Sequence, residues 1–202
     1  MTVRIPIQLM PGAKAPEPAS EEAAGYDLYA YHDAVIEPAA TLLVSSGIRL
    51  AIPAGFEAQV RPRSGLSLRT RLRIANSPGT IDADYRGLVS IICENTHPLW
   101  DPLPILLAQP ALLESFEANY RPQPLADYLK DRGMPPLPAQ WGEKEIYLDR
   151  QGYPLGTIFI KAGERIAQLV FAKVSRADFI KVQDVSVIGQ DRDGGFGSTG
   201  MI

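Results

Sequence analysis

The chain has 202 residues, a formal net charge of −3 and a single cysteine, Cys93. This length is sufficient for a buried core, and one cysteine excludes a fold stapled by disulfides and favours a reducing compartment. The acidic balance argues against broad nucleic-acid binding, and His32 and His97 have no partner at the spacing of a zinc site or a histidine-based triad. Any catalysis is therefore expected to rest on carboxylates and water.

The N-terminal stretch, residues 1–12, alternates apolar and polar residues and is interrupted by Pro6 and Pro11. It lacks the long apolar segment of a signal peptide or a membrane span. We therefore expect a soluble, intracellular, cytoplasmic protein that does not bind a membrane.

Short alternating segments, rich in β-branched residues and bounded by Gly or Pro, recur along the chain and are typical of strands joined by tight turns. They comprise residues 3–9, 34–38, 41–53, 55–62, 88–95, 156–163, 165–174 and 179–185. The series predicts an all-β sandwich or jelly roll. Residues 63–72 predict one short helix, with Ser64 near its start.

Residues 98–154 do not follow this strand pattern, because they hold 10 of the 18 prolines and the best helical patterns of the chain. Helices are expected over 105–120 and 124–133, the second with Pro124 in its first turn and Gly133 at its end. A segment of this length is too long for a simple loop, so we expect an insertion that packs on the sheet or on a neighbouring subunit. Its expected apolar face consists of Leu106, Leu112, Leu113 and Phe116, and its aromatic anchors are Trp100 and Trp141.

Five short stretches combine glycine with polar residues, namely 23–30, 61–67, 76–87, 162–171 and 191–200. Taken singly, each has a structural interpretation: a turn acid at Asp27, a helix cap at Ser64, loop acids at Asp82 and Asp84, a hairpin turn, and a disordered tail. The second stretch also opens a group of arginines that suits a polyanion such as a nucleotide phosphate tail, or else forms a solvated patch. These arginines are Arg61, Arg63, Arg69, Arg71 and Arg73.

Together and in this order, the five stretches closely resemble the five motifs of the trimeric dUTPases, the deoxyuridine triphosphate nucleotidohydrolases. The resemblance covers the chain from about residue 20 to residue 200, apart from the insertion. It implies a jelly-roll β-barrel and a homotrimer whose active sites are shared among subunits. The implied reaction is the hydrolysis of dUTP to dUMP and pyrophosphate with Mg²⁺, which supplies dUMP and keeps uracil out of DNA.

The resemblance assigns the chemistry of the third motif residue by residue. Asp82 matches the general base that activates a water for attack on the α-phosphorus, which agrees with the need for a fixed carboxylate in phosphoryl transfer. Tyr85 matches the aromatic residue that packs on the deoxyribose and leaves no room for a 2′-hydroxyl. Asn76, Gly79 and Ile81 match the segment that reads the uracil edge. Asp84 is expected to have a structural role.

The other motifs imply the contacts of the triphosphate. Ser64 and Gly65, with Arg63 beside them, and Gln168 match the groups that bind the phosphate chain. Asp27 matches an acid that reaches Mg²⁺ through water, as expected for a metal carried mainly by the phosphates. The last motif implies a lid over the bound nucleotide, with Phe196 stacked on uracil. The other expected contacts of the lid are Arg192, Gly197, Ser198 and Thr199.

Two of the departures from the family pattern concern the last motif and the domain organisation. Arg192 lies four residues before Phe196, where a spacing of five is usual. Residues 96–157 have no expected counterpart, which divides the chain into a core (1–95 and 158–190), an insertion (96–157) and a C-terminal lid (191–202). The insertion either stabilises the trimer or recognises a protein partner.

Two alternative functions remain open at this stage. One is a regulatory protein that binds dUTP and uses the insertion to contact a partner. The other is a dCTP deaminase, which shares the fold but needs a glutamate in the hairpin where this chain has Asp82.

Overall fold

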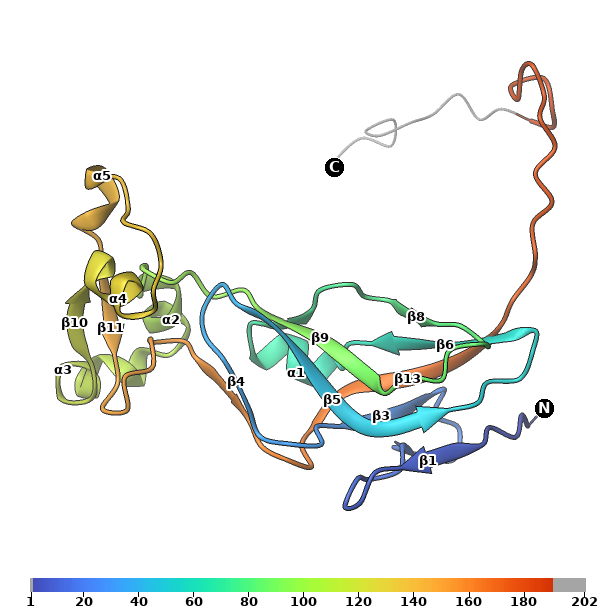
Figure 1. Ribbon diagram of the computed structural model, residues 1–202, viewed down its shortest axis with the longest axis horizontal. Helices are drawn as coiled ribbons and strands as arrows, with labels where there is room; N and C mark the ends of the chain where they lie inside the picture. The colour runs from blue at the N-terminus through green and yellow to red at the C-terminus, as the bar shows by residue number, and fades with distance from the viewer. Residues whose placement is uncertain (1, 191–202) are drawn as a thin grey trace.

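The computed structural model describes residues 2–190 and has two main antiparallel sheets (Figure 1). One sheet has the order β1–β5–β9–β7, with β1 Ile7–Leu9, β5 Thr41–Leu50, β9 Val89–Asn95 and β7 Leu72–Ile74. The other has the order β2–β3–β13–β6–β8, with β2 Glu17–Pro18, β3 Gly25–Tyr29, β13 Arg165–Lys173, β6 Phe56–Arg61 and β8 Gly79–Ile81. β4 Ala34–Ile36 pairs with β12 Ile158–Ile160.

Apolar side chains from both main sheets meet in one buried cluster, which includes Leu28, Ile48, Ile91 and Leu169. The alternation that predicted strands is seen directly in β9, where every second residue from Val89 to Asn95 is buried. The all-β jelly-roll prediction is confirmed, although the sheets remain separate within residues 2–190 and do not close into a barrel.

Cys93 lies in this core and is fully buried. Burial raises the pKa of its thiol to about 12. The thiol therefore stays protonated at neutral pH, in agreement with a packing role.

The strand predicted over residues 179–185 is wrong. After β13 the chain runs away from the sheets (Figure 1), and residues 174–190 form no strand. Phe179 and Ile180 are 93% and 80% exposed. The alternating pattern suits a strand, but a strand forms only where another edge receives its backbone hydrogen bonds, and residues 2–190 pair no such edge with this segment.

The insertion lies beyond one end of the sheets (Figure 1) and is partly helical, as predicted. Its elements are α2 Leu103–Ala108, the 3₁₀ helix η1 Pro110–Ser115, α3 Phe116–Asn119, β10 Arg121–Pro124, α4 Leu125–Asp131, α5 Ala139–Gly142 and β11 Glu145–Leu148, with β10 and β11 paired. The single helix predicted over 105–120 is broken at Pro110, whose ring and missing N–H interrupt helical hydrogen bonding.

The second predicted helix is confirmed as α4, which begins directly after Pro124. At its end Gly133 has a φ of +70°, and its N–H donates to the Lys130 carbonyl at 2.9 Å. The N–H of Met134 donates to the Leu129 carbonyl at 3.0 Å. This pair of bonds is the Schellman arrangement, for which glycine at the left-handed position is favoured.

The core of the insertion differs from the predicted one. It is formed by Leu125, Tyr128 and Ile146, with Leu99 and Leu148 packed against them. Of the predicted apolar face, only Leu106 is buried, and Leu113 is 59% exposed. Trp100 and Trp141 stack edge-to-face at 5.9 Å and are 42% and 41% exposed, so they do not anchor a buried core. The break at Pro110 explains the difference, because Leu106 lies on α2 whereas Leu112 and Leu113 lie on η1, so these residues do not share the face of one helix.

Two contacts fix the insertion to the sheets. The Tyr128 hydroxyl donates to Glu37 Oε2 at 2.6 Å, and Arg132 pairs with Glu37 Oε1 at 2.9 Å. The buried Asn95 amide donates to the carbonyls of Ile36 and Gly156, both at 2.9 Å. Asn95 therefore joins β4 to the point where the insertion returns to the core.

Asn95→Ala is expected to lower the free energy of unfolding by about 3 kcal/mol, because it removes the amide that donates to the Ile36 and Gly156 carbonyls and leaves a cavity at a fully buried position. Thermal unfolding followed by circular dichroism measures this change. The control is Thr96→Ala, which removes one exposed hydrogen bond to the Arg71 carbonyl. Equal shifts in Tm for the two variants would contradict the linking role of Asn95.

Candidate functional site

The loop between β8 and β9 carries Asp82 and Tyr85 into a small pocket of about 240 Å³. We call it the acid pocket. Its lining consists of Leu43, Asn76, Thr80, Ile81, Asp82, Tyr85, Leu88, Val89, Ser90 and Ile92. The Asp82 side chain is exposed and forms no hydrogen bond or ion pair within residues 2–190. Its carboxylate is therefore free to accept a proton from a ligand or a water.

Two arginines that sequence reasoning missed hold this loop. Arg86 donates to the carbonyls of Ala83 and Tyr85 at 2.6 and 2.8 Å. Arg49, on β5, donates to the Arg86 carbonyl at 2.8 Å. Since Arg49 is 37 residues away from Arg86 in the chain, no local pattern could have indicated this contact.

Asp84 lies on the same loop but does not line the acid pocket. It faces an open hollow, together with Arg86 and Arg176, that Asp82 also borders. Its exposed carboxylate forms no hydrogen bond or ion pair with the described residues. This position makes Asp84 a natural control for Asp82.

A second group, the arginine cluster, consists of Asp27, Arg63 and Arg165. Asp27 Oδ1 pairs with Arg63 Nε at 2.8 Å, and Asp27 Oδ2 pairs with an Arg165 guanidinium nitrogen at 3.1 Å. The Asp27 side chain is only 11% exposed, whereas those of Arg63 and Arg165 are 25% and 53% exposed. One carboxylate thus orients two guanidinium groups that retain a net positive charge and face solvent. Arg165 was not among the expected site residues.

Gln168 lies in the strand register between Asp27 on β3 and Arg61 on β6. Its amide nitrogen donates to the Pro62 carbonyl at 2.8 Å. Its amide oxygen lies so close to Gly25 that a Cβ at residue 25 would come within 2.3 Å of it. Gln168 therefore fixes the backbone that leads to Arg63, and only glycine at position 25 leaves room for it.

Ser64 and Gly65 are the first two residues of α1 Ser64–Arg69. The residue at the cap position is Arg63, so the interpretation of Ser64 as the helix N-cap is wrong. The Ser64 side chain is exposed, and its hydroxyl has no partner within residues 2–190. It is available to a ligand beside the arginine cluster.

A single chain does not bring the two groups of expected site residues together. In the β6–β8 pair Ile81 lies opposite Ala58, near the start of β6, whereas Arg63 and Ser64 follow the far end of β6 at Arg61. Figure 1 accordingly shows α1 and the loop after β8 at opposite ends of the sheet. The remaining expected residues, Arg192, Phe196, Gly197, Ser198 and Thr199, lie outside the described residues.

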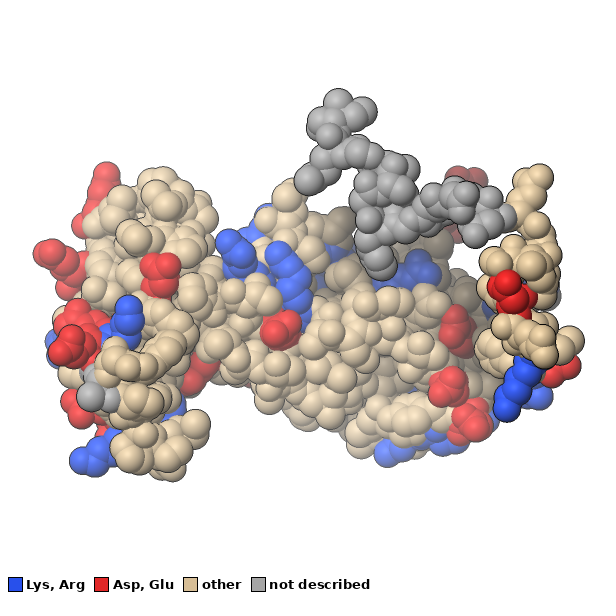
Figure 2. Space-filling model, turned by 90° about the horizontal axis from the view of Figure 1, so that it is seen from above, with Lys and Arg blue, Asp and Glu red and all other residues tan. Residues whose placement is uncertain are grey.

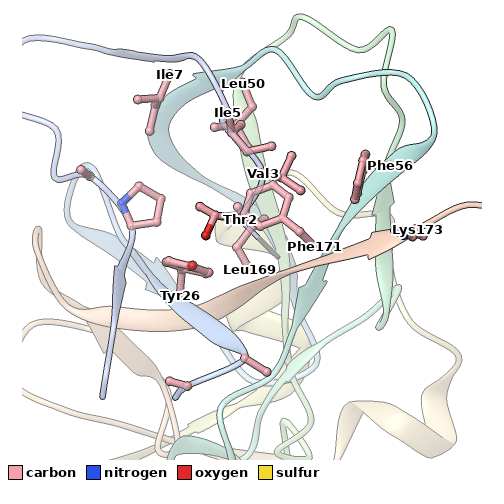
Figure 3. A pocket seen from close by; sticks show the side chains of 14 residues that line it. Thr2, Val3, Ile5, Ile7, Tyr26, Leu50, Phe56, Leu169, Phe171 and Lys173 are labelled. Atoms are coloured by element: carbon pink, nitrogen blue, oxygen red, sulfur yellow. The ribbon is translucent and has the colours of Figure 1, made fainter. Parts of the chain in front are cut away.

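A groove of about 630 Å³ contains none of the expected site residues (Figure 3). It lies between the N-terminal segment and the sheets and is lined by apolar side chains, including Ile5, Tyr26, Phe56 and Phe171. An apolar groove without acids suits packing against another chain segment better than hydrolytic chemistry.

No protein-held metal site is seen in residues 2–190, where no three His, Cys, Asp or Glu side chains cluster in a way that could hold an ion. Both oxygens of Asp27 are already paired with arginines. Burial and, to a smaller extent, Arg71 lower the pKa of His97, whose Nδ1 has no hydrogen-bond partner within residues 2–190.

The surface charge is unevenly distributed. Figure 2 shows acidic side chains gathered on the insertion and basic side chains on the core beside it. No helix within the described part of the chain is long and apolar enough to cross a membrane.

The fold is that of an all-β protein of the jelly-roll class. Its two groups of expected site residues, the acid pocket and the arginine cluster, lie at the ends of strands. The sequence model of the dUTPase family matches residues 12–98 and 154–200. The chain belongs to the dUTPase family.

Similar proteins extend this result. The deoxyuridine 5′-triphosphate nucleotidohydrolase of Hydrogenobaculum sp. (strain Y04AAS1) is 32% identical over 96% of this chain and 95% of its own length. The protein of the same name from Zymomonas mobilis is 33% identical over 100% of both chains. Both alignments run across the segment between residues 98 and 154 that the family model does not match. The solved structure of Staphylococcus bacteriophage 80alpha dUTPase with dUPNHPP is 25% identical, covers 99% of this chain and 100% of its own, and has a TM-score of 0.69.

Proposed function

We propose that this protein hydrolyses dUTP to dUMP and pyrophosphate in the cytoplasm. The observation that carries the proposal is Asp82, an unpaired carboxylate beside Tyr85 in a pocket whose loop is held by Arg49 and Arg86. The names of the two bacterial relatives give the same activity for those proteins.

Asp82 orients a water and accepts its proton as the water oxygen bonds to the α-phosphorus. The bond between the α-phosphorus and the bridging oxygen breaks, and pyrophosphate leaves. A positioned carboxylate contributes about 10² to 10⁴-fold to such a step. An exposed carboxylate at the edge of the acid pocket suits this role, because a water can reach it from the adjoining hollow.

Attack at the α-phosphorus has a direct isotopic consequence. When the reaction runs in H₂¹⁸O, the label is expected in dUMP and not in pyrophosphate, because the new bond forms on the phosphorus that dUMP retains. Mass spectrometry of both products measures this distribution, and dUMP incubated with enzyme in labelled water controls for exchange. Label in pyrophosphate would contradict the mechanism.

The remaining residues bind the nucleotide. Asn76 and Ile81 at the acid pocket, together with the backbone of Gly79 at the start of β8, read the uracil edge, and Tyr85 packs on the deoxyribose. Arg63, Ser64, Gly65 and Gln168 serve the phosphate chain, with the arginine cluster supplying positive charge. The lid residues of the last motif, Arg192, Phe196, Gly197, Ser198 and Thr199, complete the set.

Mg²⁺ is the proposed cofactor and enters on the triphosphate. The absence of an acidic cluster in the described part of the chain supports this route, because magnesium keeps its waters and is commonly held by substrate phosphates. When bound, the ion neutralises charge on the phosphates. Asp27, whose carboxylate oxygens pair with Arg63 and Arg165, would reach the ion only through a bound water.

The active assembly is a homotrimer in which each active site is shared. The separation of Asp82 from Ser64 supports this proposal, because a nucleotide bound at both needs a second chain. The exposed apolar residues after β13 also support it: Val174, Phe179, Ile180, Val182, Val185, Val187 and Ile188. The proposed chain has a core (1–95 and 158–190), an insertion (96–157) and a lid (191–202). The insertion contacts a neighbouring subunit or a protein partner.

Light scattering coupled to gel filtration is expected to give three times the 22.0 kDa of one chain. Asp82→Asn chains alone and Ser64→Ala chains alone are expected to be inactive. A mixture of the two then recovers activity, because some shared sites receive an intact Asp82 from one chain and an intact Ser64 from another. A 22.0 kDa species with full activity would contradict the trimer.

A further inference from the structure

The Tyr85 ring is folded back over its own loop. Its hydroxyl donates to the Leu88 carbonyl at 3.0 Å. A Cβ built on Gly87 would come within 2.2 Å of the Tyr85 hydroxyl oxygen, 2.4 Å of Cζ and 2.9 Å of Cε2. Side-chain carbons do not approach other atoms this closely, so the observed ring position requires glycine at residue 87.

The backbone of Tyr85, which carries the ring, is held by two further hydrogen bonds. The Tyr85 N–H donates to the Asp82 carbonyl at 3.1 Å, and Arg86 donates to the Tyr85 carbonyl at 2.8 Å. The ring remains 45% exposed, so little surrounding packing restrains it. Its position therefore depends mainly on these hydrogen bonds and on the space above Gly87.

A side chain excludes a larger ligand by steric overlap only if the ligand cannot displace it. A side chain held by hydrogen bonds and close packing keeps its place within about 0.5 Å, whereas a shift of about 1 Å changes rates by up to 10²-fold. For an exposed aromatic ring, the groups that fix its rotamer are thus as important for selectivity as the ring itself.

We propose that Gly87 and the Leu88 carbonyl are positioning elements for sugar selectivity. They hold the Tyr85 ring where it collides with the 2′-hydroxyl of a ribonucleotide and accepts a deoxyribose. The inference rests on the proposed function, because it concerns how the same pocket distinguishes dUTP from UTP. It assigns a role to a glycine that touches no substrate and to a backbone oxygen.

Gly87→Ala tests this role through the ratio of kcat/KM for dUTP to that for UTP. The ratio is expected to fall about 10-fold, because the added methyl group forces the ring off its position. Asp84→Ala is the matched control on the same loop and should keep the wild-type ratio, since the Asp84 carboxylate forms no hydrogen bond or ion pair with the described residues and the Tyr85 hydroxyl bonds to Leu88 instead. Thermal unfolding of each variant measures any loss of stability separately from selectivity.

Two further variants keep the test independent of folding defects. Tyr85→Phe removes only the bond to the Leu88 carbonyl and is expected to lower the ratio several-fold, about 3-fold or more, since one hydrogen bond contributes roughly 1 kcal/mol. Tyr85→Leu removes the ring. Adding Gly87→Ala to Tyr85→Leu should then change the ratio no further, because residues that act through one contact are not additive.

A crystal structure of Gly87→Ala gives a readout that does not depend on activity, and it is expected to show the ring displaced and the Leu88 carbonyl released. A wild-type protein that favours dUTP, with an unchanged ratio or an unmoved ring in Gly87→Ala, would overturn the inference and leave the proposed function intact. A wild-type protein that hydrolyses dUTP and UTP equally would overturn the sugar assignment of the proposed function, and the inference with it.

Discussion

Replacing Asp82 with Asn is expected to lower the turnover of dUTP by about 10³-fold while dUTP still binds. The amide has nearly the same shape as the carboxylate but cannot accept the proton of the attacking water. Because the Asp82 carboxylate has no partner among the described residues, its replacement disturbs no hydrogen bond of the folded chain. Pyrophosphate release measures turnover, and calorimetric titration with a non-hydrolysable dUTP analogue measures binding.

Asp84→Asn is the control for this variant, because it makes the same chemical change two residues further along the same exposed loop. It is expected to retain near-wild-type turnover, because Asp84 does not line the acid pocket and its carboxylate forms no hydrogen bond or ion pair with the described residues. Near-normal turnover in Asp82→Asn, or an equal loss in both variants, would remove Asp82 from the role of general base.

Asp27→Asn is expected to lower kcat/KM for dUTP by about 10²-fold, because misplaced binding groups carry costs of this size. The change removes the charge that holds Arg63 at 2.8 Å and Arg165 at 3.1 Å, so the two guanidinium groups repel each other and lose their orientation. The loss is expected to persist at saturating Mg²⁺, since added metal does not restore the ion pairs.

The control for Asp27 is Asp33→Asn. Asp33 also pairs with a cation, Lys161 at 2.9 Å, but its side chain is 60% exposed. Exposed ion pairs contribute little, about 0 to 1 kcal/mol, so this variant should retain activity. Full recovery of Asp27→Asn by excess Mg²⁺ would contradict the arginine-positioning role and favour an effect through the metal alone.

The sequence predicted most of the fold, because alternation of buried and exposed residues is a local signal that the sheets preserve. β9 illustrates this agreement, with Val89, Ile91 and Cys93 all facing the core. The same signal failed at residues 179–185, which pair with no strand in the described part of the chain. It also failed for the helix at 105–120, where Pro110 outweighed the apolar pattern.

The candidate site was predicted only as far as local motifs reach. The stretch around Asp82 and Tyr85 drew attention because acids and an aromatic lie between a turn and a glycine. Arg49 and Arg165 were missed, because each acts on a segment distant in sequence: Arg165 lies 138 residues from Asp27. Strand register decides such contacts, and composition or spacing within one segment does not reveal register.

Gly87 shows the same limit in another form. Its position after Arg86 marks the end of a turn in the sequence, but only the folded loop shows that the Tyr85 ring occupies the space of its missing side chain. The sequence around Tyr85 and Gly87 therefore did not reveal that the ring of one packs over the backbone of the other.

Pyrophosphate release from dUTP, UTP, dCTP and dTTP, measured in parallel with Mg²⁺ and then with EDTA, tests the central claim most directly. We expect metal-dependent release from dUTP alone, because in the proposed function the acid pocket reads uracil and deoxyribose and the metal enters on the phosphates. Release from none of the four nucleotides, or ammonia release from dCTP, would contradict the assignment of this chain as an enzyme that hydrolyses dUTP.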